Sequence, residues 1–176
     1  MWDIEGHMRD TKTCSWQAER GLLPPGEALH DMWIRVTIDT SFVIHAIESS
    51  MERRPFVECS GAVDPMQSMV GVTMGPGWRR IIDSRLGGVQ GCTHLRELLF
   101  NMATVAYQTA ASQRGTLEEQ AVYMAQVQKP PFHLSKCLGW DLGGPVVERH
   151  YPQFFASAQS RAPDAADEPC TPTDDS

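Results

Sequence analysis

The feature that most constrains the fold is a pair of alternating apolar stretches joined by a short polar turn. Residues 31–38 (DMWIRVTI) and 42–47 (FVIHAI) are rich in β-branched and aromatic side chains, and DTS lies between them at 39–41. Alternation with a period of two around a short turn predicts a β-hairpin with one buried face. Pairing Ile38 with Phe42 places one apolar set on that face: Met32, Ile34, Val36, Ile38, Phe42, Ile44 and Ala46.

Residues 2–10 alternate in the same way, which predicts a further half-buried strand. Trp2, Ile4 and Met8 share one face of it. The opposite face carries charged or polar groups: Asp3, Glu5, His7 and Arg9. The segment 14–27, with two glycines and two prolines, favours a loop.

Helix signals follow the strands. Asp64-Pro65 predicts a short helix as far as Val70, and a second helix over 78–86 begins after Pro76 and ends at a glycine pair. The longest helix is predicted over 93–112 from an apolar stripe at helical spacing. The stripe comprises Leu95, Leu98, Leu99, Met102, Val105 and Ala106.

Beyond the long helix, Thr116 and Glu119 form the pattern of a capping box for one more helix. Residues 132–142 and 146–151 are expected to add one or two late strands. Strands followed by helices predict an α+β fold, in which a small antiparallel sheet (the N-terminal strand plus the hairpin 31–47) is packed by helices. We expect a single domain over 1–155.

The segment 156–176 is expected to be a disordered acidic tail, because its Ala, Asp, Pro and Ser content buries too little apolar area. The formal net charge of −7 argues against nucleic-acid binding, which needs clustered cations. No apolar run approaches the roughly 20 residues of a membrane helix, and no signal peptide is present, so a cytoplasmic location is expected. No glycine-rich nucleotide fingerprint follows a strand.

Several short strings resemble one family. They are WDIEG (2–6), DTK (10–12), HDMW (30–33), GPGWRR (75–80), GCTHL (91–95) and HYP (150–152). Together they resemble the domain-of-unknown-function family 2889 over 2–155. The resemblance implies the fold but no activity. It also implies a further strand upstream of Trp2, and it places family cysteines at Cys59 and Cys137 and a Gly-Cys-Thr-His motif at Cys92 and His94.

The motif Gly91-Cys92-Thr93-His94 opens the long helix. Free backbone N–H groups and the positive end of the helix dipole favour anions there, including a thiolate. The alternative is structural: Cys92 packs against the sheet, and Thr93 or His94 caps the helix.

A metal site is a second hypothesis. Three thiols and an imidazole (Cys59, Cys92, His94 and Cys137) make a possible zinc or iron–sulfur ligand set. However, the five cysteines are scattered, and no C-x-x-C pair is present. Within one helix, Cys92 and His94 would also point about 200° apart. Buried, unliganded thiols are the other interpretation, and no cofactor is favoured.

Acid–base groups cluster near the ends of the predicted strands. Asp10 and Lys12 close the first strand, and His30 and Asp31 open the hairpin. Carboxylate and imidazole groups act as general acid and base when a site desolvates them. By contrast, the row of charges from Asp3 to Arg9 favours a solvated sheet face with cross-strand ion pairs.

Arg79 and Arg80 follow GPGW at a predicted helix start, where they could hold a carboxylate or phosphate. Trp33 and Trp78 could line an apolar pocket or simply pack in the core. The sequence thus predicts a cofactor-independent acid–base enzyme of the lyase or isomerase type, acting on a small apolar, aromatic or acyl metabolite. Catalysis is assigned to His94, His30, Asp31, Asp10 and Cys92, and substrate binding to Arg79, Arg80, Trp78, Lys12 and Trp33.

Two other functions remain open from the sequence. One is a metal or iron–sulfur accessory protein using the Cys/His set. The other is a non-catalytic interaction module, possible as a homodimer formed through an open sheet edge.

Overall fold

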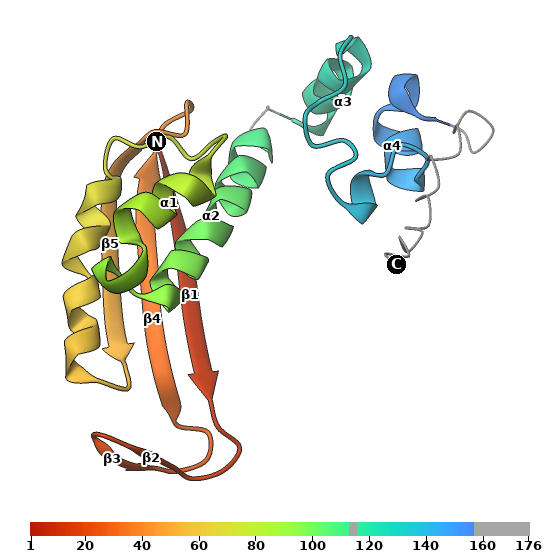
Figure 1. The fold of residues 1–176 in the computed structure, drawn as a ribbon. Helices are drawn as coiled ribbons and strands as arrows, with labels where there is room; N and C mark the ends of the chain where they lie inside the picture. The colour runs from red at the N-terminus through yellow and green to blue at the C-terminus, as the bar shows by residue number, and fades with distance from the viewer. Residues whose placement is uncertain (113–115, 157–176) are drawn as a thin grey trace, which may run out of the picture. The chain divides into compact units, whose positions relative to one another are not determined.

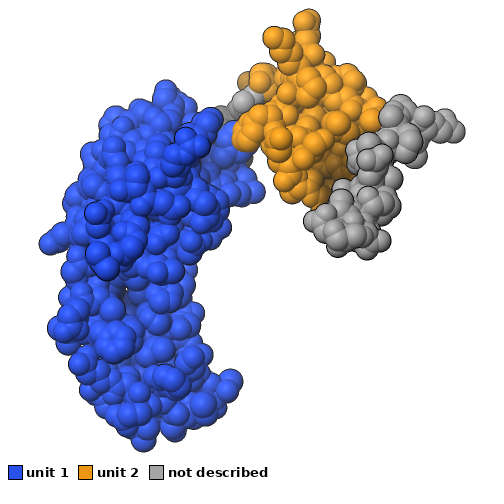
Figure 2. All heavy atoms as spheres, viewed as in Figure 1, with its two compact units in different colours: residues 1–113 blue, residues 114–176 orange. Residues whose placement is uncertain are grey.

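The computed structural model describes residues 1–112 and 116–156. They belong to two compact units, residues 1–113 and 114–176, coloured separately in Figure 2. The single domain over 1–155 stays a prediction from the sequence. The predicted tail lies almost entirely outside the described residues.

Unit 1 is an α+β unit whose three-stranded antiparallel sheet has the order β1-β4-β5 (Figure 1). The strands are β1 (Trp2–Thr11), β4 (Ala28–Ile38) and β5 (Ile44–Arg53). Between β1 and β4 the chain forms a small hairpin, β2 (Trp16–Ala18) and β3 (Gly21–Leu23). The prediction of a plain loop over 14–27 was therefore wrong, because three-residue strands are too short to show a period-two pattern.

The hairpin β4–β5 was predicted correctly, but its register was not. Ile38 lies opposite Ile44 rather than Phe42, and an irregularity between Thr37 and Ile38 shifts the pairing. As a result Ile47 is buried and Ala46 is exposed. A one-residue slip exchanges the two faces of a strand, and only the packed helices decide which face is buried.

Two helices cover the apolar face of the sheet, α1 (Trp78–Leu86) and α2 (Thr93–Ser112) (Figure 1). Both have the predicted bounds, and α2 buries most of its predicted stripe, although Val105 is exposed. The segment predicted as a helix over 64–70 is the 3-10 helix η2 (Asp64–Met69). The turns η1 (Val57–Ala62) and η3 (Gly88–Gln90) complete the unit.

Helix α2 lies directly on β1 at Gly6. A Cβ atom on Gly6 would lie 2.9 Å from Met102 Sδ and 3.1 Å from Leu98 Cδ1. Glycine therefore permits a close approach of the helix to the strand. Leu98 is one helical turn beyond His94, and Gly6 is four residues before Asp10, so this contact fixes where the start of α2 meets the end of β1.

Unit 2 is helical in the part that the structure describes. Its elements are α3 (Leu117–Gln126), η4 (Leu138–Trp140), α4 (Pro145–His150) and η5 (Pro152–Phe154). The late strands predicted over 132–151 were wrong: the segment forms η4 and α4 around a small core that includes Val147 and Tyr151. The capping box of Thr116 and Glu119 is confirmed. None of the helices within 1–112 and 116–156 has the length and apolar character required to cross a bilayer.

Candidate functional site

The candidate site begins with Asp10 and His30, which are paired residues on β1 and β4. His30 has the same parity as Met32 and Ile34, so its side chain lies on the helix-covered face and is buried. Nδ1 of His30 lies 3.0 Å from both carboxylate oxygens of Asp10, and the backbone N–H of His30 donates to Asp10 Oδ1 at 2.6 Å. The carboxylate thus fixes both the backbone and the ring of His30.

The first turn of α2 brings His94 to this pair. The rings of His30 and His94 lie with their centroids 4.1 Å apart at an interplanar angle of 42°. The ring of His94 otherwise faces solvent, because His94 is an exposed residue. The buried ring of His30 therefore lies between two more exposed groups, the carboxylate of Asp10 and the imidazole of His94.

Cys92 joins the same group. The helix begins at Thr93, and the carbonyl of Cys92 accepts the hydrogen bond from the N–H of Arg96 at 3.0 Å, so Cys92 is the N-cap residue. Because Cys92 precedes the helix, the 200° separation expected within a helix does not apply. Its Sγ lies 3.7 Å from His94 Nδ1.

The electrostatics of the group differ between its two ends. Partial burial raises the pKa of Asp10, but the hydrogen bonds and positive charge of His30 outweigh burial, so the pKa is lowered. The pKa of His94 is lowered from its ordinary value of 6.5, first by partial burial and then by the charge of His30, with Asp10 acting in the opposite direction. At neutral pH His94 is therefore uncharged and has a ring nitrogen available to accept a proton.

These shifts predict a pH-dependent stability. Folding keeps His94 neutral, so the unfolded chain binds this proton at a higher pH than the folded chain does. We expect the contribution of His94 to the free energy of unfolding to be complete above its ordinary pKa of 6.5. This contribution should decline as the pH falls below that value. Because the pKa of Asp10 is also lowered, the protein should lose further stability as the pH falls below the ordinary pKa of this carboxyl group, 3.8.

Urea unfolding of the wild type and of His94→Ala at about pH 7.5 and about pH 5 measures the first effect. The loss of unfolding free energy on acidification should be smaller in His94→Ala. His150→Ala, at an exposed position on α4, is the matched control and should follow the wild type. Identical pH dependence in wild type and His94→Ala would contradict the expectation.

Asp31, which was assigned to the same site, lies on the opposite face of the sheet. Its carboxylate is 2.7 Å from His7 Nε2 and 3.4 Å from Arg9 Nε. Further along the same face, Glu5 forms an ion pair with Arg35 at 2.6 Å. The predicted cross-strand ion pairs are therefore present, and Asp10 rather than Asp31 orients the imidazoles. The parity of His30 and Asp31 relative to Met32 was the signal that separates them.

The residues predicted to bind substrate are dispersed. Arg79 and Arg80 line a shallow hollow of about 620 Å³ at the start of α1, together with Trp78 and Phe100. The Arg79 guanidinium lies 3.7 Å from the centroid of the Phe100 ring. Phe100 is six residues beyond His94, about 120° around the helix axis, so the hollow lies on a different side of α2.

Two further predicted binding residues also lie elsewhere. Lys12 Nζ is 5.2 Å from the ring of Trp16 in the β2–β3 hairpin. Trp33 lies on the charged face of the sheet, where Arg35 is 5.9 Å from its ring. Neither contact involves His94, so these side chains do not extend the Asp10–His30–His94 group.

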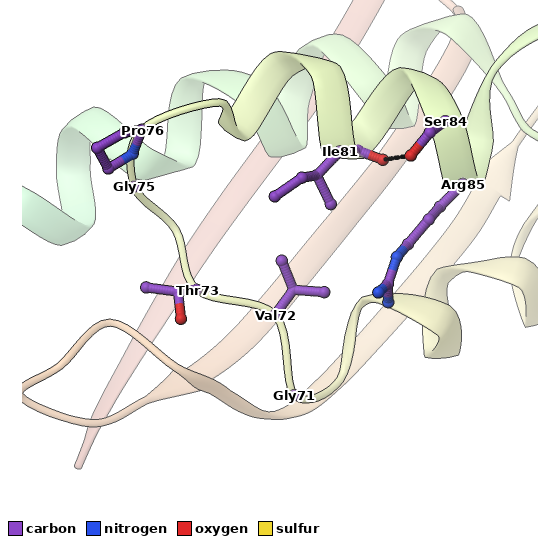
Figure 3. Close-up of a pocket in the computed structure, with 8 residues that line it drawn as sticks. All are labelled: Gly71, Val72, Thr73, Gly75, Pro76, Ile81, Ser84 and Arg85. Atoms are coloured by element: carbon purple, nitrogen blue, oxygen red, sulfur yellow. Dashed lines mark hydrogen bonds between the residues drawn. The ribbon is translucent and has the colours of Figure 1, made fainter.

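A second hollow, of about 420 Å³, lies between the chain at 71–76 and α1 (Figure 3). Ser84 and Arg85 line it, and both are engaged with backbone carbonyls: Ser84 Oγ donates to Ile81 O at 2.8 Å, and Arg85 donates to Ser68 O. His94 does not line this hollow. His94 is exposed, so the group of Asp10, His30, His94 and Cys92 reaches the surface at His94.

The four proposed metal ligands do not form a cluster within the described residues, where no three His, Cys, Asp or Glu side chains are placed to hold an ion. Cys92 and His94 are neighbours, but Cys59 packs against the main core of unit 1 and Cys137 belongs to unit 2.

Unit 1 is thus an α+β unit with two helices on one face of a small antiparallel sheet and a carboxylate–imidazole–imidazole–thiol group at the sheet end. The chain belongs to the family described as Protein of unknown function (DUF2889), whose model matches residues 1–108. The match includes Asp10, His30, Cys92 and His94, while Cys137 lies outside it. Comparison with curated proteins and comparison with solved structures each found no match.

Proposed function

We propose that unit 1 is a cofactor-independent acid–base enzyme in which His94 removes a proton from a carbon next to a carbonyl group. One observation carries the proposal: a neutral, exposed imidazole is held against a buried imidazole that is fixed by a carboxylate. General bases work best when they are unprotonated at the working pH and within reach of the substrate. The exposure of His94 and its lowered pKa support this role.

The tautomer of His94 follows from its neighbour. Nδ1 faces the sulfur of Cys92 at 3.7 Å, so a hydrogen on Nδ1 directed at Sγ leaves Nε2 free to accept a proton. When Nε2 takes the proton, His94 becomes positive beside His30, and the carboxylate of Asp10 offsets the added charge. Asp10 and His30 therefore position and tune His94 rather than react with the substrate.

The beginning of α2 offers a place to stabilise the negative charge that forms when the proton is removed. Removing a proton next to a carbonyl places negative charge on the carbonyl oxygen. The first N–H groups of a helix have no partner within the helix, and they carry its positive dipole end. A carbonyl oxygen bound at the start of α2 would be stabilised as its charge develops. Elimination and isomerisation both proceed through such a step, which agrees with the lyase or isomerase type predicted.

The contact between Cys92 and His94 favours a second candidate, nucleophilic catalysis. A thiol beside an imidazole at a helix start is the arrangement of many cysteine nucleophiles. In that case His94 removes the proton of Cys92, and the thiolate attacks the acyl carbon of a thioester. The bond to the leaving thiolate breaks, and His94 returns the proton to that thiolate. The two candidates assign different roles to Cys92, and one substitution separates them.

The test is deuterium exchange from solvent into small carbonyl compounds with an apolar body, namely phenylacetone, acetophenone and phenylpyruvate, followed by proton NMR. The proposed enzyme accelerates exchange of at least one compound above the buffer rate. Cys92→Ser should retain this activity if His94 is the base. Loss of activity in Cys92→Ser, together with acylation of the wild-type thiol by a phenyl thioester, would favour the nucleophile instead. Buffer-level exchange for every compound would contradict the proposal.

A further inference from the structure

A third hollow lies where the β2–β3 hairpin approaches the end of β5, at the lower end of the sheet in Figure 1. It has a volume of about 330 Å³, near the lower limit for small-molecule sites. Its lining combines three arginines with a short apolar run: Arg20, Arg53, Arg54, Pro55, Phe56 and Val57. His94 does not contribute to it, so this hollow is separate from the site proposed above.

The arginines of this hollow have unused donors. The side chain of Arg53 makes no hydrogen bond or ion pair with any residue that the structure describes. Arg54 donates from Nη1 to Met51 O at 3.0 Å, but its buried Nε has no partner among the described residues. A buried donor without a partner is costly unless a ligand or water satisfies it. The unpaired guanidinium of Arg53 therefore favours an acceptor within the hollow, and Arg54 lines the same hollow.

The third arginine is already fixed. Arg20 Nη2 donates to Ala28 O at 2.5 Å and lies 3.8 Å from Glu27. Its position is thus set before any ligand arrives, which lowers the entropy lost on binding. Glu19 and Glu52 also line the hollow, and Glu52 accepts a hydrogen bond from Ser50. The lining has three arginines and two glutamates, and Glu27 offsets the charge of Arg20, so Arg53 and Arg54 are the cations that a ligand would meet.

The apolar part of the lining limits the ligand class. Phe56 and Val57 are 57% and 70% exposed, so the hollow offers them an unfilled apolar surface. Arginine binds a carboxylate through two parallel hydrogen bonds, and an apolar body attached to that carboxylate would cover Phe56 and Val57. We infer that this hollow binds a small monocarboxylate with an aromatic or aliphatic body, held by Arg53 and Arg54.

The test uses hydrocinnamate as the probe and its uncharged amide, hydrocinnamamide, as the matched ligand control. Calorimetric titration of the full chain should show saturable binding of the carboxylate, at least about 10-fold tighter than the amide, since charge-assisted hydrogen bonds exceed neutral ones by that margin. Inorganic phosphate should bind no more tightly than the amide. Equal affinity for acid and amide, or tight binding of phosphate alone, would overturn the assignment.

Substitutions locate the binding. Arg53→Gln should weaken hydrocinnamate binding by about 10-fold without loss of stability, because Arg53 has no partner to lose. Arg54→Gln should weaken hydrocinnamate binding more than Arg53→Gln does. Arg53→Gln is nevertheless the decisive variant, because Arg54→Gln also removes the hydrogen bond to Met51 O. Arg80→Gln is the control, since Arg80 is an exposed arginine of another hollow. Weakening by Arg80→Gln and not by Arg53→Gln would overturn the proposal.

Amide chemical shifts give an independent readout. Hydrocinnamate should shift the amide signals of Arg53, Arg54, Phe56 and Val57 and leave those of residues 77–80 unchanged. His94→Ala should bind the probe with unchanged affinity, so failure of the acid–base proposal and failure of this one are distinguishable. Shifts confined to residues outside 19–20 and 52–57 would contradict the location.

Discussion

Replacing His94 by alanine is expected to lower the rate of deuterium exchange into a responsive carbonyl compound by about 10²- to 10⁴-fold, the usual contribution of a general base. The reason is the chain of contacts from Asp10 through His30 to His94, which leaves a neutral imidazole at the surface. The measurement is the exchange rate at saturating protein and neutral pH, with far-UV circular dichroism to confirm that the variant is folded.

Two further readouts separate a catalytic His94 from a structural one. Because His94 is exposed, added imidazole can reach the space left by the substitution and should restore part of the activity of His94→Ala. The wild-type rate should stay level from neutral pH down to about the ordinary pKa of 6.5 and fall only below it, since the pKa of His94 is lowered. An exchange rate that is unchanged in His94→Ala contradicts the role of base. Loss of the rate together with unfolding, and without rescue by imidazole, also contradicts it.

Replacing Gly91 by alanine is expected to destabilise unit 1 by about 3 kcal/mol, the upper part of the range for overpacking. A Cβ atom on Gly91 would lie 2.5 Å from the carbonyl oxygen of Leu86 and 3.2 Å from its Cβ. Both atoms belong to the end of α1 and cannot move as the tip of a flexible side chain does. The connection between α1 and α2 must therefore shift.

Urea unfolding measures this effect, and a decrease in Tm on the order of 10 °C should accompany it. Gly61→Ala is the matched control, because a Cβ there meets no atom within 4 Å. The shift in Gly91→Ala also moves the first turn of α2, so the exchange activity should fall in the fraction that remains folded. Stability of Gly91→Ala within about 0.5 kcal/mol of Gly61→Ala would show that the connection adapts.

The candidate site was only partly accessible from the sequence. The motif Gly91–His94 was recognised from its place at a helix start, and the structure places Cys92 and His94 together there. Asp10 and His30 were selected with Asp31, although alternation along β4 already puts Asp31 on the face opposite His30 and Met32. Only the pairing of β1 with β4 places Asp10 beside His30. The hollow at Arg53 and Arg54 had no sequence signal, because its walls come from the turn between β2 and β3 and from the end of β5 with the residues after it, which are distant in the chain.

Local patterns by themselves determined the alternating faces of β1 and β4, the bounds of α1 and α2, and the capping box of α3. Each depends on side chains within a few residues of one another, so local chemistry is enough. Tertiary structure alone decided the register of β4 with β5, the division into two units and the contact of His94 with His30. These depend on which distant surfaces pack together, and the free energy of that packing is not contained in any short stretch of sequence.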